Sequence, residues 1–188
     1  MSTYSTIYPL PTSVDWLTGE LQGEGIQESV TTLGKLAGLF QDEAARQVMN
    51  PETVVYRVRY WHPVAEGTEG GLFWGATILQ PGRVGDEYFM TRGHSHVVSN
   101  RAEIYATVRG AGLLLLMGED GEVTTQPMTP GSVHYIPGMT AHRTINIGEE
   151  ELVFLASWPS DAGHAYGGVG NRGFSKRVLC RNGAPCLL

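Results

Sequence analysis

The chain has 188 residues, of which 41% are hydrophobic and 17% charged, and its formal net charge is −6. This length predicts a single globular domain whose core needs no disulfide support. No run of Lys or Arg stands out, which argues against a nucleic-acid partner. The apolar runs, such as Leu113 to Met117, are far too short for a membrane span.

The cysteine content and the N-terminal residues point to a reducing compartment. Cys180 and Cys186 are the only two cysteines, and their spacing does not fit a C-x2-C metal pair. We therefore expect two free thiols. The N-terminal sequence lacks the charged start and apolar core of a signal peptide, which predicts a cytoplasmic protein.

The first 50 residues are expected to form an arm and one or two short helices. Residues 1–28 are polar, glycine-bearing and aperiodic, which is typical of an extended arm. The helical signal lies between residues 29 and 50, where Asp42 can cap the segment EAARQVM and Asn50-Pro51 can end it. This part should pack on a β-barrel over residues 51–188 within one domain.

From Thr53 onward the sequence reads as short strands separated by turns. Apolar and polar residues alternate in several of them, and GEDGE at residues 118–122 is a hairpin signal. This spacing predicts an all-β barrel or double-sheet roll. Asp86 and Glu87 are expected to be solvated charges. The expected strands are 54–61, 71–80, 87–96, 102–108, 112–117, 122–128, 132–137, 142–147, 151–158 and 174–180.

Three histidines and one glutamate form a candidate metal site. His94 and His96 are two positions apart on an expected strand, so both should point to one face. Glu103 begins the next expected strand, and His142 follows the turn at Pro137. Three imidazoles and one carboxylate suit divalent Fe, Mn, Ni, Co or Zn, with positions left for water or substrate.

The two segments that carry these ligands resemble the two motifs of the cupin superfamily. The first motif usually reads G-x5-H-x-H-x3,4-E-x6-G, and the second G-x5-P-x-G-x2-H-x3-N. Here six residues separate His96 from Glu103, and the second-motif glycine is Gly138, one position early. With FMTRGHSHVVSNRAEIYATVRGAGLLLL, AHRTIN, WPSDAGHAYG and GFSK in that order, residues 50–180 closely resemble the cupin-type glucose-6-phosphate isomerases.

The resemblance implies a cupin β-barrel, usually a homodimer, that reversibly converts glucose 6-phosphate to fructose 6-phosphate in glycolysis and gluconeogenesis. It implies one divalent metal per subunit, with Fe2+ as the first choice, bound by His94, His96, Glu103 and His142. Glu103 would also be the catalytic base, and His164 would assist opening of the sugar ring. Tyr105 lies two positions after Glu103 and could hydrogen-bond the sugar.

The remaining expected site residues contact the substrate and its phosphate. Arg92 stands where relatives commonly carry Lys, and Trp158 stands where they usually carry Tyr, so position 158 offers no hydroxyl to the substrate. His62 and His134 match no motif position. The expected substrate and phosphate contacts are Tyr56, Thr77, Thr91, Arg92, Gly93, Trp158 and Tyr166.

The sequence leaves several alternatives open. Glu103 could shuttle a proton between the two carbons, or it could only hold the metal while hydride shifts. A cupin dioxygenase or decarboxylase can share the same ligands, and non-catalytic sugar-binding or storage cupins are further alternatives. Arg92 and the DAGHAYG segment favour a sugar phosphate.

Overall fold

The computed structural model describes residues 11–166 and 173–188. Residues 1–10 of the expected arm and Gly167 of the DAGHAYG segment lie outside the described residues. The described elements are β1 (Ser13–Val14), β2 (Leu21–Gln22), β3 (Gln27–Thr32), η1 (Gly34–Leu36), α1 (Glu43–Val48), β4 (Val54–Trp61), β5 (Leu72–Leu79), β6 (Arg83–Val84), β7 (Glu87–Tyr88), β8 (Glu103–Arg109), β9 (Gly112–Met117), β10 (Val123–Met128), β11 (Val133–Ile136), β12 (Ala141–Asn146), β13 (Leu152–Pro159), β14 (Val178–Arg181) and β15 (Ala184–Leu187).

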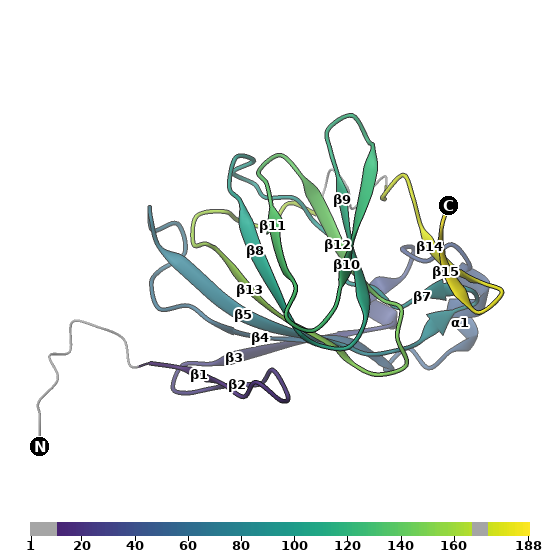
Figure 1. The fold of residues 1–188 in the computed structure, drawn as a ribbon, viewed down its shortest axis with the longest axis horizontal. Coiled ribbons are helices and arrows are strands. Elements are labelled where there is room, and N and C mark those ends of the chain that lie inside the picture. Colours follow the sequence, from purple (N-terminus) through teal and green to yellow (C-terminus); the bar gives the residue numbers. More distant parts are fainter. Residues whose placement is uncertain (1–10, 167–172) are drawn as a thin grey trace, which may run out of the picture.

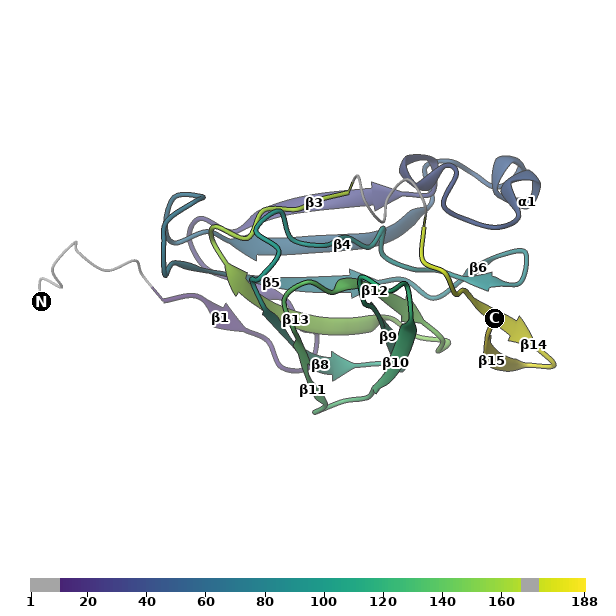
Figure 2. The ribbon, with the colours of Figure 1, turned by 90° about the horizontal axis from the view of Figure 1, so that it is seen from above.

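A large curved sheet forms one wall of the molecule. Its six strands are antiparallel in the order β11-β8-β13-β5-β4-β3 (Figure 2). A three-stranded sheet, β10-β9-β12, lies across from it (Figure 1). The side chains of the main hydrophobic core lie between the two sheets. The all-β barrel predicted from the sequence is confirmed.

Strand β13 is buried on both faces, which explains its continuous apolar sequence. Phe154 points to the main core, whereas Leu155 packs on the other side with Ala76 of β5 and with Leu21 of β2. The small β1–β2 hairpin therefore covers part of the outer face of the large sheet. A strand covered on both sides has no need of alternating polar residues.

The short helices expected near the N-terminus are present. Helix α1 begins after Asp42, whose side chain accepts a hydrogen bond from the backbone N–H of Ala45 at 2.8 Å. This capping bond satisfies one of the free N–H groups at the helix start. The expected arm differs, because residues 13–14 and 21–22 pair as the β1–β2 hairpin. Residues 27–32, most of which lie in the region expected to be helical, form strand β3 and pair with β4. Among the described residues, no helix is long and apolar enough to cross a membrane.

The strand predicted for residues 87–96 is wrong. Only residues 87 and 88 form a strand, β7, and Gly93 has φ +76, which an extended strand does not permit. The following segment is instead held by tertiary hydrogen bonds. His94 N–H donates to the His142 carbonyl at 3.1 Å, and His142 N–H donates to the His94 carbonyl at 2.9 Å. Two expected metal ligands are thus joined backbone to backbone.

Glu87 is buried, contrary to the expectation that it would be solvated. Its carboxylate accepts hydrogen bonds from Arg177 at 2.8 Å and from the backbone N–H of Gln41 at 2.7 Å. The ion pair ties the C-terminal segment to β7, and the hydrogen bond from Gln41 ties β7 to the region before α1. Cys180 and Cys186 are free thiols, as expected.

Candidate active site

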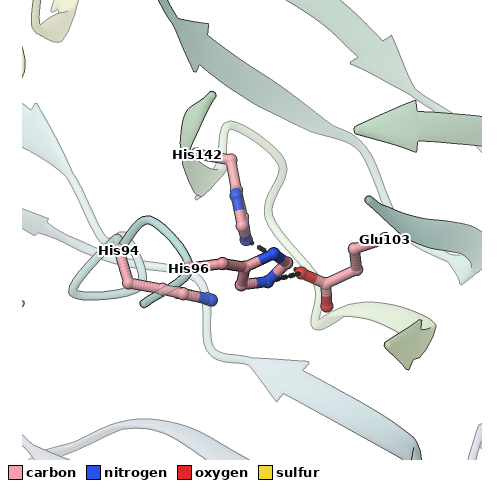
Figure 3. Close-up of side chains that lie close together, drawn as sticks. All are labelled: His94, His96, Glu103 and His142. Carbon is pink, nitrogen blue, oxygen red and sulfur yellow. Dashed lines mark ion pairs between the residues drawn. The ribbon is translucent and has the colours of Figure 1, made fainter. Parts of the chain in front are cut away.

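Four side chains from three parts of the chain converge at one point inside the barrel. The segment between β7 and β8 supplies two histidines, β8 supplies a glutamate from its first residue, and β12 supplies the third histidine (Figure 3). One ligand atom from each lies within 4.8 Å of the other three. This metal-ligand group consists of His94, His96, Glu103 and His142.

The ligand atoms of the group are buried and lack protein partners. The Nε2 atoms of the three histidines and Oε2 of Glu103 have no hydrogen-bond partner among the described residues. His142 Nε2 lies 3.1 Å and His96 Nε2 3.3 Å from Glu103 Oε2, without hydrogen-bond alignment. Buried polar atoms are rarely left unpaired. Three nitrogens and one oxygen directed at one another therefore fit a divalent cation.

A hydrogen bond on the side of the ring away from Glu103 fixes the orientation of His96. Its Nδ1–H donates to the Arg101 carbonyl at 2.7 Å, which turns Nε2 toward Glu103. A second partner of this kind is usual for a metal-binding histidine, because it sets the tautomer and the ring plane. The Arg101 side chain donates to both carboxylate oxygens of Asp161, at 3.0 and 2.7 Å. Asp161 thereby connects this support to the loop that carries His164.

The protonation states suit metal binding. Burial and the neighbouring His142 hold the pKa of His94 well below its usual value, so its imidazole is neutral at pH 7. Burial raises the pKa of Glu103, but His142 and His96 outweigh it and the net pKa is lowered. Burial lowers the pKa of His96, yet Glu103 and the Arg101 carbonyl raise it overall. Binding a cation would release any proton held on His96.

A pocket of about 310 Å³ opens beside the metal-ligand group. The large sheet supplies most of its lining, through the inward-facing residues of β3, β4, β5, β8 and β13. Every site residue expected from the sequence lines this pocket except His96, whose Nε2 lies 3.3 Å from Glu103 Oε2. The lining residues expected from the sequence are Tyr56, Thr77, Thr91, Arg92, Gly93, His94, Glu103, Tyr105, His142, Trp158, His164 and Tyr166.

Comparison with known proteins assigns the family. The sequence model of the family described as glucose-6-phosphate isomerase matches residues 30–186. A protein of Pyrococcus furiosus named glucose-6-phosphate isomerase is 43% identical, over 93% of this chain and 92% of its own. The chain belongs to the glucose-6-phosphate isomerase family. A relative with the same name from Thermococcus litoralis is 42% identical, over 93% of this chain and 91% of its own.

The comparison with solved structures found weaker likenesses, among them an oxalate oxidase in complex with the substrate analogue glycolate. It is 14% identical, with a TM-score of 0.46, and the match covers 79% of this chain and 58% of that one. A mutant oxalate decarboxylase from Bacillus subtilis is 24% identical, with a TM-score of 0.45, over 58% of this chain and 27% of its own. The all-β architecture predicted from the sequence is present in this isomerase family member, with a six-stranded and a three-stranded sheet on either side of the core.

The sequence analysis missed four polar lining residues, Ser29, Thr31, Tyr60 and His62, for two different reasons. Ser29 and Thr31 come from β3, where the sequence suggested an arm followed by helix. His62 directly follows β4 and stacks on Phe73 at 3.7 Å between ring centroids. For Tyr60 and His62 a signal existed, because the two-residue period of β4 that directs Tyr56 inward continues to positions 60 and 62.

His164 lies against the metal-ligand group, as its family motif suggested. Its ring centroid is 4.6 Å from that of His94, and it stacks with Tyr166 at 6.1 Å. Burial lowers the pKa of His164, with smaller opposing contributions from its charged neighbours, so the ring is neutral at pH 7. Backbone hydrogen bonds between Ser95 and Ala165, at 3.2 and 2.8 Å, hold this loop against the ligand segment.

Two positions that depart from the family pattern also line the pocket. The Arg92 guanidinium donates to the Lys35 carbonyl at 2.6 Å and lies 5.9 Å from the Tyr166 ring centroid. Part of the hydrogen-bonding capacity of the Arg92 guanidinium is therefore already used within the protein. The indole of Trp158 lies over Gly75, where an added Cβ would approach a ring carbon at 3.0 Å. Glycine at position 75 thus makes room for the tryptophan.

Proposed function

We propose that this protein is a metal-dependent aldose–ketose isomerase that interconverts glucose 6-phosphate and fructose 6-phosphate. Membership of the glucose-6-phosphate isomerase family supports this activity. The observation that most supports it is the pocket itself. There the buried metal-ligand group, three histidines and one carboxylate, lies beside hydroxyl, guanidinium and backbone hydrogen-bond donors. The pocket volume of about 310 Å³ lies at the lower end of the volumes of small-molecule binding sites, which suits a ligand of the size of one sugar phosphate.

The reaction moves a hydrogen between C1 and C2 of the open-chain sugar. A divalent metal held by the metal-ligand group would supply Lewis-acid polarisation of the reacting oxygens. Glu103 is proposed to take the proton from one carbon and return it to the other. Its lowered pKa makes it a weak base, and the competing mechanism is therefore a hydride shift in which Glu103 only holds the metal.

Two further residues are proposed to handle protons during the reaction. Burial and the Glu103 carboxylate raise the pKa of Tyr105 well above its usual value, so its phenol stays protonated and can donate to a sugar oxygen. The neutral imidazole of His164 can accept a proton from a sugar hydroxyl during ring opening. The phosphate is proposed to bind near Thr91, Arg92 and Gly93, with Tyr56, Thr77, Trp158 and Tyr166 as the other substrate contacts.

Metal removal tests the proposed activity directly. The chelator-treated protein should be inactive in a coupled dehydrogenase assay that follows conversion of fructose 6-phosphate to glucose 6-phosphate. Adding back Fe2+, Mn2+, Ni2+, Co2+ or Zn2+ separately should restore activity and rank the metals, with Fe2+ proposed as native. A His142→Ala variant should lose both metal and activity, because one of four ligands is gone.

One outcome would overturn the isomerase proposal. If each metal binds stoichiometrically and none restores isomerisation, an oxygen-dependent cupin reaction becomes the better explanation, and oxygen uptake would be measured next. We place the enzyme in cytoplasmic glycolysis and gluconeogenesis. Cell fractionation with an antibody to the chain would contradict the compartment if the protein sedimented with membranes or appeared in the medium.

We further propose that the enzyme is a homodimer. Apolar side chains are exposed on neighbouring strands of the large sheet, where Tyr135 of β11 pairs with Ile104 of β8 and Val133 lies two residues along. Exposed apolar clusters often mark subunit interfaces. Light scattering should give a mass of about twice 20.4 kDa, and Tyr135→Lys should shift it toward the monomer. A wild-type mass of 20.4 kDa at micromolar concentration would contradict the proposal.

A further inference from the structure

A buried arginine lies behind the pocket wall that carries Thr91, Arg92 and Gly93. Arg143 is on β12, and only 4% of its surface is exposed. A guanidinium group stays charged at neutral pH even when it is buried. Among the described residues, no carboxylate lies within ion-pair distance of it. Buried charges are costly without a counter-charge.

The contacts of Arg143 are few for a charged group. Its Nη2 donates to the Arg92 carbonyl at 2.7 Å, and its guanidinium lies 4.6 Å from the ring centroid of Phe174. Its Nε is buried and has no hydrogen-bond partner among the described residues. The cation–π contact offsets part of the desolvation cost. It supplies no negative charge, and the nearby buried carboxylate of Glu87 lies beyond ion-pair distance and is already paired with Arg177. An anion on the other side of the wall would therefore complete the compensation.

The geometry of the wall shows what Arg143 holds in place. The Arg92 carbonyl points to Arg143, and a Cβ added to Gly93 would also meet Phe174 and Arg143. In a trans peptide the carbonyl and the next N–H point in opposite directions. The N–H of Gly93 is therefore directed away from Arg143, toward the pocket that Gly93 lines.

We propose that Arg143 is a positioning residue for the phosphate group of the substrate. It fixes the Arg92–Gly93 peptide with the Gly93 N–H facing the pocket, and it places a fixed positive charge behind that donor. The inference rests on the proposed function, because it assumes a phosphorylated ligand. Thr91 is held to the same strand, donating its N–H to the Thr144 carbonyl at 2.9 Å, so the whole segment is anchored on β12.

Titration calorimetry with inorganic phosphate tests this role on the full-length, metal-free protein. Arg143→Met should weaken phosphate binding by about tenfold or more, because a buried charge and a charge-assisted contact are lost. Arg143→Lys keeps the charge but not the planar fork, and we expect an intermediate, roughly threefold loss. Arg57→Met is the matched control, since Arg57 is exposed on β4 and the same net charge is removed. It should leave the dissociation constant for phosphate unchanged.

Several results would overturn the inference. These are an unchanged dissociation constant in folded Arg143→Met, an equal loss in Arg57→Met, or no phosphate binding by the wild-type chain at millimolar concentrations. Circular dichroism checks the fold, and if Arg143→Met does not fold, Arg143→Lys decides. Failure of the proposed function looks different, because the phosphate affinities would then follow the expected order while no metal restores isomerisation.

Discussion

Replacing Glu103 with Gln is expected to lower kcat/KM of the metal-loaded enzyme by roughly 10²- to 10⁴-fold, the usual contribution of a positioned acid–base group. Glutamine keeps the size of the side chain and one oxygen ligand, but it has neither charge nor basicity. Glu103 is almost fully buried, and one of its oxygens lies close to both His96 and His142. It is the one carboxylate of the metal-ligand group, so no other member of the group can take its role. Kinetics should be measured together with metal content by mass spectrometry.

The matched variant Glu103→Asp separates ligand binding from proton transfer. It keeps the charge and the basicity but withdraws the carboxylate by one methylene. If proton transfer operates, wild-type turnover in D2O should introduce deuterium at C1 or C2 of the sugar, and a hydride shift should not. A Glu103→Gln variant that binds a full complement of metal and retains more than a tenth of wild-type activity would contradict a catalytic role for this carboxylate.

Gly110→Ala is expected to lower the free energy of unfolding by at least about 3 kcal/mol. Gly110 lies in the turn between β8 and β9 with φ +82, a conformation that L-residues other than glycine adopt at a cost. An added Cβ would overlap the carbonyl oxygen of Glu151 and approach the Leu152 Cα at 2.8 Å. Both clashes are with backbone, which cannot move aside without displacing β13.

The control for this variant is Gly121→Ala. Gly121 has φ +80, almost the same backbone strain, but an added Cβ would meet nothing within 4 Å. Its cost should be only the conformational part, about 1–2 kcal/mol. Urea unfolding of both variants measures the difference. Equal losses would show that the contact with β13 contributes nothing and that Gly110 is needed only for the conformation of the turn.

The regular strands were predictable because their pattern is local. The segments 54–61 and 112–117 were predicted with the boundaries that β4 and β9 have, since turns flank both, and the first alternates in polarity while the second is a short apolar run. The segment 87–96 was not, because Gly93 leaves the extended conformation and the backbone of His94 bonds to β12 instead. The conformation of such a segment depends on its tertiary contacts, and the local sequence does not reveal them.

The same distinction applies to the site. The metal-ligand group was predictable because ligand types and spacings are written into two motifs, and the structure brings all four residues together. Arg143 also lies within a motif, but its role depends on Phe174 and on the Arg92 carbonyl, which are distant in sequence. Glu87 was misjudged for the same reason, since its partner Arg177 is 90 residues away.

Strand β3 forms part of the pocket although it lies at the edge of the large sheet. It is the last strand of the large sheet and pairs with β4, yet Ser29 and Thr31 line the pocket. Edge strands detach at a lower free-energy cost than central ones. A ligand that touches β3 and the central strands together binds only when the edge is closed, so its binding free energy adds to the cost of opening. In a growing cell, the concentration of the sugar phosphate would therefore govern how often this edge is exposed to cleavage by proteases and to strand pairing with other protein chains.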